Sequence, residues 1–173
     1  MKNKSRLEVE IKVKANRTLM EKKLREWKIP RISQEEQIDI YYTHPCRDFK
    51  ISDEVLRVRR SDTGFFLTYK GPRIGKQTKI REEIELKVNK DIYLLLERLR
   101  FRKFGEVKKK RETYMMGNFL ISLDEVEKLG DFLEIETSNL EEREEMIELL
   151  EKLGIPRRFS IIKSYLELLN EST

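Results

Sequence analysis

Two carboxylates and an ammonium group alternate with apolar residues near the amino terminus, in the stretch LEVEIKVKA. Side chains at positions i and i+2 of a strand lie on one face, about 7 Å apart. Glu8, Glu10 and Lys12 therefore share one face of the predicted strand. Carboxylates bind hard divalent cations, and ammonium groups bind the phosphate oxygens that such cations bridge. The stretch predicts either a metal and phosphate site or an ordinary solvated strand face.

Charged residues recur at the same spacing along the other strand-like segments. The basic members are Arg57, Arg59, Lys70, Arg81, Lys109 and Arg111, and the acidic members are Glu83, Glu85, Asp124, Glu134 and Glu136. In VKKKRETY the run of basic residues leaves the register open, because either Lys109 with Arg111 or Lys108 with Lys110 can share a face. Each strand taken alone is explained by an antiparallel sheet with one wet face.

Taken together, these ladders leave two further interpretations. Basic ladders suit a polyanion such as a nucleic acid, but Glu8, Glu10, Glu134 and Glu136 would repel it unless cations lay between them. Mixed ladders that face one another inside a barrel would form a metal and phosphate site instead. Periodicity does not distinguish a barrel lumen from a solvated surface.

The elements that must position these residues follow from periodicity and from turn and capping residues. We expect strands over 6–14, 32–43, 54–61, 64–71, 79–87, 103–115, 118–126 and 131–137, and helices over 17–27, 91–100 and 140–153, with a short helix in KSYLELLN. Asn16 is a predicted N-cap, Ser138 with Glu141 a predicted capping box, and Trp27 a predicted core residue. About eight strands in antiparallel order predict an α+β domain with a rolled sheet or barrel, formed by residues 1–173 as one domain.

Composition narrows the class of protein. Charged residues make up 40% of the 173 residues and apolar residues 38%, and the abundance of Lys and Glu favours a thermophilic source. The net charge of +5 allows an anionic partner. One histidine, His44, excludes a His-rich zinc site, so a metal would be held by carboxylates, which favours Mg²⁺ or Mn²⁺.

The location follows from two further features of the sequence. Cys46 is the single cysteine, so no intramolecular disulfide forms. No stretch approaches the roughly 20 apolar residues of a membrane span. We therefore expect a cytoplasmic protein without membrane contact.

The ordered charged segments resemble the CYTH family, also known as triphosphate tunnel metalloenzymes, whose first strand carries an ExExK pattern. That pattern corresponds here to Glu8, Glu10 and Lys12. The further matches, in order, are DIYYTHP, LRVRR, LTYKGP, REEIE, KKKRETY, SLDEVEKLGDFLEIE and KSYLELL. The resemblance covers nearly the whole chain and implies an eight-stranded antiparallel barrel with covering helices and a triphosphate in its tunnel.

The resemblance also implies residue roles. Glu8, Glu10 and Lys12 would be catalytic, the metal would be held by Glu8, Glu10, Asp124, Glu134 and Glu136, and the phosphates by Lys12, Arg57, Arg59, Lys70, Arg81, Lys109 and Arg111. The roles of Glu83 and Glu85 stay open. Lys163 and Tyr165 would close one tunnel mouth.

Three activities are compatible with this resemblance. The first is metal-dependent hydrolysis of tripolyphosphate, thiamine triphosphate or a nucleoside triphosphate. The second is the class IV adenylyl cyclase reaction, although the leader MKNKSRL lacks the His-Phe pair typical of that subgroup. The third is non-catalytic binding of a polyphosphate or nucleotide. The expected partner is a small triphosphate and not a nucleic acid, and a homodimer is one open alternative.

Overall fold

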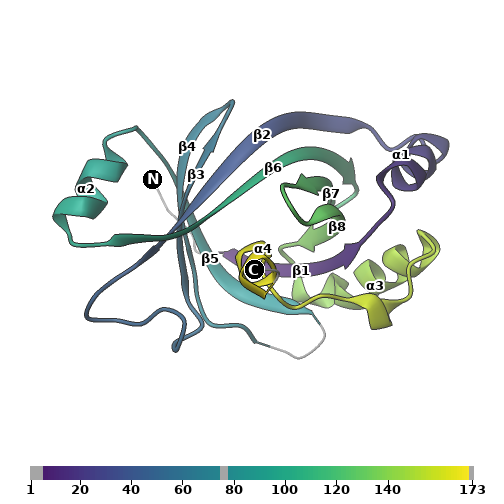
Figure 1. Cartoon of the computed structure of the whole chain (residues 1–173). Coiled ribbons are helices and arrows are strands. Elements are labelled where there is room, and N and C mark those ends of the chain that lie inside the picture. Colours follow the sequence, from purple (N-terminus) through teal and green to yellow (C-terminus); the bar gives the residue numbers. More distant parts are fainter. Residues whose placement is uncertain (1–5, 75–77, 172–173) are drawn as a thin grey trace.

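The sheet of this protein closes into a barrel, as seen in a computed structural model that describes residues 6–74 and 78–171 (Figure 1). Within those ranges eight antiparallel strands follow one another around the barrel in the order β1-β5-β4-β3-β2-β6-β7-β8. Strand β1 pairs with β5 on one side and with β8 on the other, which closes the ring. The expected α+β fold with an eight-stranded barrel and covering helices is confirmed. The start of the leader, residues 1–5, lies outside the described residues.

The elements agree closely with those expected from the sequence. The strands are β1 (Arg6–Lys14), β2 (Arg31–Thr43), β3 (Val55–Ser61), β4 (Gly64–Lys70), β5 (Lys79–Val88), β6 (Arg102–Met116), β7 (Phe119–Val126) and β8 (Gly130–Thr137). The helices are α1 (Arg17–Glu26), α2 (Ile92–Arg98), α3 (Arg143–Lys152) and α4 (Tyr165–Glu171), with short 3₁₀ turns η1 (Leu140–Glu142) and η2 (Arg157–Phe159).

The alternation in β1 explains why the charged side of the sheet is the inner side. Val9, Ile11 and Val13 are buried in the main apolar cluster, outside the barrel wall. Glu8, Glu10 and Lys12, on the opposite face, line the interior. Because helices cover the apolar face, the charged face is left to form the lumen.

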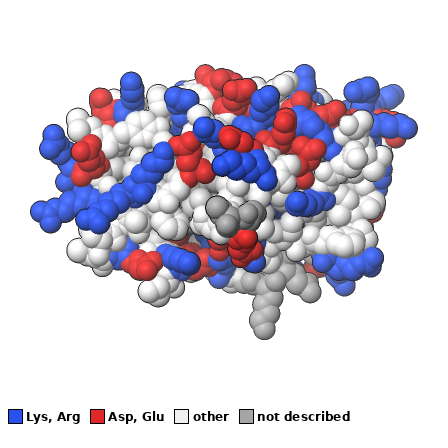
Figure 2. Space-filling model, in the orientation of Figure 1, with Lys and Arg blue, Asp and Glu red and all other residues white. Residues whose placement is uncertain are grey.

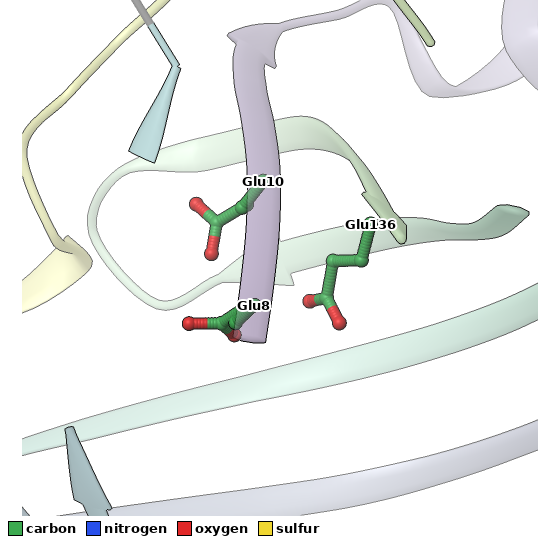
Figure 3. Close-up of side chains that lie close together, drawn as sticks. All are labelled: Glu8, Glu10 and Glu136. Carbon is green, nitrogen blue, oxygen red and sulfur yellow. The ribbon is translucent and has the colours of Figure 1, made fainter. Parts of the chain in front are cut away.

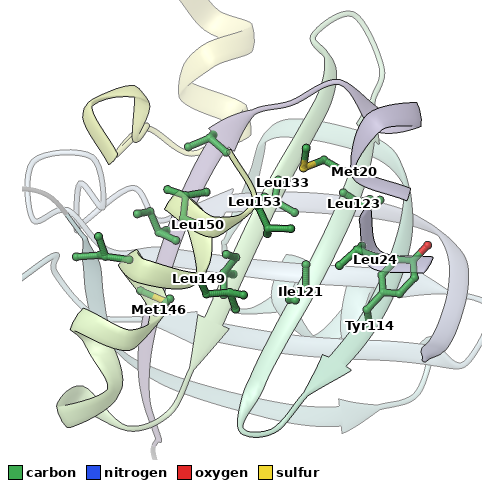
Figure 4. Close-up of a cluster of buried hydrophobic side chains, with 14 of the residues drawn as sticks. Met20, Leu24, Tyr114, Ile121, Leu123, Leu133, Met146, Leu149, Leu150 and Leu153 are labelled. Carbon is green, nitrogen blue, oxygen red and sulfur yellow. The ribbon is translucent and has the colours of Figure 1, made fainter. Parts of the chain in front are cut away.

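The main apolar cluster lies between α1, α3 and the outer face of the barrel (Figure 4). Met20 and Leu24 of α1 and Met146, Leu149, Leu150 and Leu153 of α3 and its C-cap pack against Ile121 and Leu123 of β7 and Leu133 of β8. Each fully buried aliphatic side chain of this kind stabilises the fold by about 1.5–3 kcal/mol. The cluster therefore holds β1, β7 and β8, which carry the acidic ladders.

Helix α2 covers a different part of the barrel, on the far side from α1 and α3 (Figure 1). Its buried residues Ile92 and Leu96 pack with Val58 of β3, and Leu67 of β4 joins this second cluster. The outer faces of β3 and β4 are thus shielded as well, which leaves Arg57 and Arg59 on the inner face of β3.

The barrel has two mouths that differ in construction. At one end Ser164 and Tyr165 line the interior, and we call this end the α4 mouth. The other end is lined by Arg6, Leu120 and Glu136, and we call it the β1 mouth. Helix α4 comes close to β6 because Gly105 has no side chain. A Cβ at that position would lie 2.5 Å from Leu166 Cδ1.

Two sequence-based expectations were wrong in detail, and one open register is resolved. Trp27 is the C-cap of α1 and is 39% exposed, because it follows the helix and is not part of its buried face. The expected capping box at Ser138 is replaced by Asn139, whose side chain accepts a hydrogen bond from the Glu141 amide. In β6, Lys109 and Arg111 face inward and are buried, whereas Lys108 and Lys110 are exposed.

Candidate active site

A charged tunnel runs through the barrel. Its cavity of about 230 Å³ is lined by residues from all eight described strands. All but one of the candidates predicted from the sequence to face inward line it, namely Glu8, Glu10, Lys12, Arg57, Arg59, Lys70, Arg81, Glu83, Glu85, Lys109, Arg111, Glu134 and Glu136. Asp124 lies behind this lining, fully buried. The closure of the barrel therefore brings together residues that lie up to about 130 positions apart in the chain.

Three carboxyl groups gather on one wall of the tunnel (Figure 3). Glu8 and Glu10 project from β1 and Glu136 from β8, and one oxygen of each lies within 4.8 Å of the others. Glu136 is paired with Glu10 across the two strands. Burial and the neighbouring Glu8 charge raise the pKa of Glu136 to about 7. A hard divalent cation would relieve this repulsion, and oxygen ligands at such spacing suit one.

The other two predicted metal ligands are engaged with cationic side chains. Both oxygens of Asp124 accept hydrogen bonds from Arg111 at 2.6 Å, and Oδ2 accepts another from Lys109 at 3.1 Å. Glu134 lies 3.1 Å from Lys12 Nζ and also binds Arg111. Burial opposes the charge on Glu134, but Lys12 and Arg111 hold its pKa well below the usual range. These two carboxylates are thus paired with cations, and the same cations also approach the cluster, with Lys12 Nζ 3.2 Å from Glu10 and Arg111 Nη1 3.9 Å from Glu136.

Lysine ammonium groups bind two of the three carboxylates of this cluster, Glu8 and Glu10. Lys70 Nζ lies 2.6 Å from Glu8 Oε2 and 2.9 Å from Glu83 Oε2. Lys79 Nζ donates to Glu10 Oε1 at 2.8 Å, and Lys12 Nζ lies 3.2 Å from the same oxygen. Although burial opposes its charge, these two lysines lower the pKa of Glu10 to about 2. Glu10 is therefore ionised at neutral pH.

Two of the tunnel lysines have pKa values that lie much closer to neutral pH than the usual value for lysine. Burial lowers the pKa of Lys79 to about 8. Burial and the adjacent Arg111 charge lower the pKa of Lys109 to about 8 as well. An anionic ligand between them would stabilise both protonated forms, since a nearby opposite charge favours the ionised state. These ammonium groups therefore suit a bound polyphosphate.

On the opposite wall of the tunnel, Asp39 of β2 accepts hydrogen bonds from two arginine side chains. Its two oxygens accept a bidentate pair from Arg59 at 2.7 and 2.8 Å, and Arg57 Nη1 approaches Oδ2 at 3.3 Å. Burial opposes the charge on Asp39, but Arg59 and Arg57 hold its pKa below the usual range. This carboxylate orients both guanidinium groups toward the lumen.

Two buried arginines that line the tunnel each have a guanidinium nitrogen without a hydrogen-bond partner. Within the described residues, the Nε atoms of Arg57 and Arg81 are inaccessible to solvent and make no hydrogen bond. Buried donors are nearly always satisfied in native proteins, so an orphaned pair in one cavity points to a missing acceptor. Phosphate oxygens are suitable acceptors, because guanidinium binds them through charge-assisted hydrogen bonds.

The α4 mouth is narrowed by Tyr165. Its ring lies over Lys12 Nζ at 4.2 Å and packs edge-on against Phe132, with ring centroids 5.0 Å apart. Lys163, expected to help close this mouth, is exposed, and its ammonium group binds Glu171. Only its backbone carbonyl reaches the tunnel, at 3.4 Å from Lys12 Nζ.

The structure adds site residues that the sequence analysis did not assign. Lys79 precedes Arg81 by two positions and shares its face, so strand parity could have identified it. Asp39 lies in the DIYYTHP segment, at a position of β2 that faces the lumen. Arg73 lies in the loop between β4 and β5, where no periodicity marks it. It binds Asp53 at 2.8 Å and Glu167 at 3.0 Å.

Comparison with known proteins agrees with this architecture. The CYTH domain model matches residues 6–165. A Methanocaldococcus jannaschii protein named "Putative adenylate cyclase MJ0240" is 41% identical over 171 residues, covering 94% of this chain and 98% of that protein. The structure of the PH1819 protein from Pyrococcus horikoshii OT3 is 44% identical, covers 96% of this chain and 99% of that one, and superposes with a TM-score of 0.82.

A more distant solved structure shares the fold. HpAC1 from Hippeastrum, described as an adenylyl cyclase candidate with a dominant triphosphatase activity, is 15% identical with a TM-score of 0.72. The alignment covers 97% of this chain and 96% of that one. None of the helices in residues 6–74 and 78–171 is long and apolar enough to span a membrane.

Proposed function

Because the chain belongs to the CYTH domain family, we propose that its tunnel binds a triphosphate and hydrolyses it with Mg²⁺ or Mn²⁺. Members of this family are triphosphatases or adenylate-cyclase-like enzymes. The observation that carries the proposal is the enclosure of a three-carboxylate cluster and two orphaned guanidinium donors in one tunnel. The carboxylates suit a hard cation, and the guanidinium groups suit phosphate oxygens.

The metal role falls on Glu8, Glu10 and Glu136. A divalent cation at these oxygens supplies charge neutralisation and polarises the phosphorus centre. Lys70 and Lys79, which now neutralise Glu8 and Glu10, can then turn to phosphate oxygens. Asp124 and Glu134 stay candidate ligands from the family resemblance. We propose that in the free protein they orient Arg111, Lys109 and Lys12.

The phosphate role falls on the cationic side chains around the cluster. Arg57 and Arg59 are oriented by Asp39, and Arg111 is oriented by Asp124. Positioning plus electrostatic stabilisation of the transferring phosphoryl group accounts for most of the catalysis of such reactions. The tunnel supplies both, because its donors are held by buried carboxylates before any ligand arrives.

The position of the carboxylates near the β1 mouth favours hydrolysis of the triphosphate over its cyclisation. Glu8 and Glu136 line the tunnel and also a hollow at the β1 mouth, which opens to solvent. Water can therefore reach a phosphorus centre bound at the cluster. A cyclase would instead need the ribose of ATP at this same position.

A surface that binds nucleic acid has less support. Figure 2 shows Lys and Arg intermixed with Asp and Glu over the face in view, without a broad area of one sign. Polyanion binding requires clustered positive charge. The buried cations of this protein lie inside the barrel, where a small triphosphate fits and a duplex does not.

A substrate panel tests the proposal. The protein is incubated with tripolyphosphate, thiamine triphosphate and ATP with Mg²⁺ or Mn²⁺, and phosphate, pyrophosphate and cyclic AMP are quantified. We expect phosphate release, lowered at least about 100-fold by Glu10→Gln, because an oriented ligand to the cation is lost. Glu125→Gln, an exposed change on β7, is the matched control. Cyclic AMP as the main product would support the cyclase instead, and triphosphate binding without turnover would support a non-catalytic binder.

A further inference from the structure

Two neighbouring side chains of β2 place hydrogen-bond acceptors without a donor in the tunnel. Glu35 and Gln37 both line the cavity. Glu35 Oε2 and Gln37 Oε1 are inaccessible to solvent and accept no hydrogen bond from the described part of the chain. Gln37 Nε2 donates to Glu35 Oε1 at 2.7 Å, which fixes the direction of the amide, because the reverse orientation would set two oxygens against each other. Buried acceptors are nearly always satisfied, so this pair indicates a ligand that donates hydrogen bonds.

The pair lies across the tunnel from the three-carboxylate cluster. In the strand order of the barrel, three strands separate β2 from β1 in either direction, so the two strands face each other. The cluster projects from β1 and from β8, the neighbour of β1. A phosphoryl group bound at the cluster therefore turns its other side toward Glu35 and Gln37.

Glu35 lies toward the β1 mouth. Tyr41, further along β2, lines the tunnel and also the cavity next to Ser164 at the α4 mouth. Glu35 is instead paired with Arg111 of β6, whose guanidinium comes within 3.9 Å of Glu136, a residue of the β1 mouth. Water that enters at the β1 mouth thus meets Glu35 before it meets the α4 end of the tunnel.

The surroundings of the pair decide which donor it takes. Ionised phosphate oxygens only accept hydrogen bonds, so they satisfy neither Glu35 Oε2 nor Gln37 Oε1. A second metal ion is disfavoured, because Lys109 and Arg111 lie directly across from Gln37 and Glu35 on the adjacent strand β6 and carry positive charge. A water molecule can donate one hydrogen to each oxygen and keeps a lone pair directed away from both. Water is therefore the ligand that fits.

We infer that Glu35 and Gln37 hold the water molecule that attacks the terminal phosphorus, and that Glu35 is its general base. This inference rests on the proposed hydrolysis. The water oxygen forms a bond to the terminal phosphorus, the bond from that phosphorus to its bridging oxygen breaks, and the diphosphate part leaves with the electron pair. One proton of the water passes to the Glu35 carboxylate, and Gln37 positions both the water and that carboxylate. The attack comes from the wall opposite the three-carboxylate cluster.

Two substitutions test these roles. Glu35→Gln keeps the shape of the side chain but removes the base, and Gln37→Met keeps its length but removes the amide. Glu36→Gln and Gln34→Met make the same chemical changes at exposed positions of β2 and are the matched controls. For each variant, kcat and KM are measured by phosphate release from whichever triphosphate of the substrate panel the unmodified protein hydrolyses fastest, over a range of Mg²⁺ concentrations. Calorimetry in EDTA gives the dissociation constant of the same triphosphate without turnover, and circular dichroism verifies the fold.

We expect Glu35→Gln to lower kcat about 100-fold or more, the contribution of a positioned general base. Gln37→Met should lower kcat about tenfold, the loss of one hydrogen bond to the water. The KM, the dissociation constant and the Mg²⁺ concentration for half-maximal rate should change less than about threefold, because neither side chain contacts phosphate or metal. Both controls should match the unmodified protein.

Three results would overturn this inference and leave the proposed function standing. One is an unchanged kcat in Glu35→Gln, and another is a loss confined to KM and the dissociation constant, which would mean that Glu35 acts in substrate binding. The third is recovery of the Glu35→Gln rate at raised Mg²⁺, which would make Glu35 a metal ligand. If the unmodified protein releases no phosphate from any triphosphate of the panel, the proposed function is overturned as well.

Discussion

The Tyr165 hydroxyl donates a hydrogen bond to Asp124 Oδ2 at 2.9 Å, inside the barrel and 41 positions away in the chain. The same carboxylate oxygen binds Arg111 at 2.6 Å. Tyr165 begins α4, so this contact links the last helix directly to the charged network of the tunnel. One carboxylate therefore both holds the start of α4 at the α4 mouth and orients Lys109 and Arg111, two of the proposed phosphate-binding side chains.

Removal of the Tyr165 hydroxyl should destabilise the protein. Tyr165→Phe keeps the ring over Lys12 but removes a hydrogen bond to a charged acceptor, which contributes about 1.5–3 kcal/mol. We expect the free energy of unfolding, measured by denaturant titration, to fall by about that amount. Tyr93→Phe on α2, outside the tunnel, is the control. Equal losses in the two variants would show that the contact with Asp124 contributes nothing specific.

Gly105 should be required for the docking of α4. In Gly105→Ala the new methyl group meets Leu166 Cδ1 at 2.5 Å, and such overpacking typically costs about 1–3 kcal/mol. We expect lower stability and faster hydrogen exchange of the α4 amides. The double variant with Leu166→Ala should lose less stability than the sum of the single changes, because the two clash with each other. Gly71→Ala, where a Cβ makes only ordinary contact, is the control. Additive losses in the double variant would contradict this interpretation.

The guanidinium of Arg57 should contribute more to triphosphate binding than its positive charge alone. Arg57→Lys keeps the charge but removes the planar fork and the orphaned Nε donor, which favour bidentate phosphate binding. We expect the KM for tripolyphosphate to rise about tenfold, with a smaller effect on stability. The exposed residue Arg60 on the same strand provides the control Arg60→Lys, which should leave KM unchanged. A tenfold rise in both variants would point to long-range electrostatics instead.

Triphosphate affinity should decrease in alkaline solution. The pKa of Lys109 is lowered to about 8 by burial and by Arg111, so the side chain is protonated below that pH and neutral above it. A polyanion binds the protonated form better, so the dissociation constant should rise between pH 7 and pH 9, with a slope of up to about tenfold per pH unit for one proton.

The variant Lys109→Arg isolates this contribution, because arginine stays charged over the whole range. We expect a shallower pH profile in calorimetric titrations with tripolyphosphate, and the titration of the ligand itself cancels in the comparison. Lys79, whose pKa is also lowered to about 8, should preserve part of the slope. Identical profiles for the two proteins would rule out Lys109 as the titrating group.

Much of the local structure was determined by the sequence alone. Alternation in β1 assigned Glu8, Glu10 and Lys12 to one face, and the turn at Gly64 joined β3 to β4 as expected. These features depend on neighbours two to four positions away, so they can be recognised from periodicity and turn chemistry. Trp27 was misplaced because the end of a helix, unlike its middle, does not follow the helical repeat.

The tertiary structure decided which face of the sheet is the inside and which carboxylates meet. Closure requires β1 to pair with both β5 and β8, far apart in the chain, and no local pattern encodes that choice. Once the ring closes, Glu136 joins Glu8 and Glu10, whereas Glu134, on the same face of β8, is neutralised by Lys12 and Arg111. The repeat along a strand determines which side chains share a face, but only the packing of distant strands determines what that face encloses.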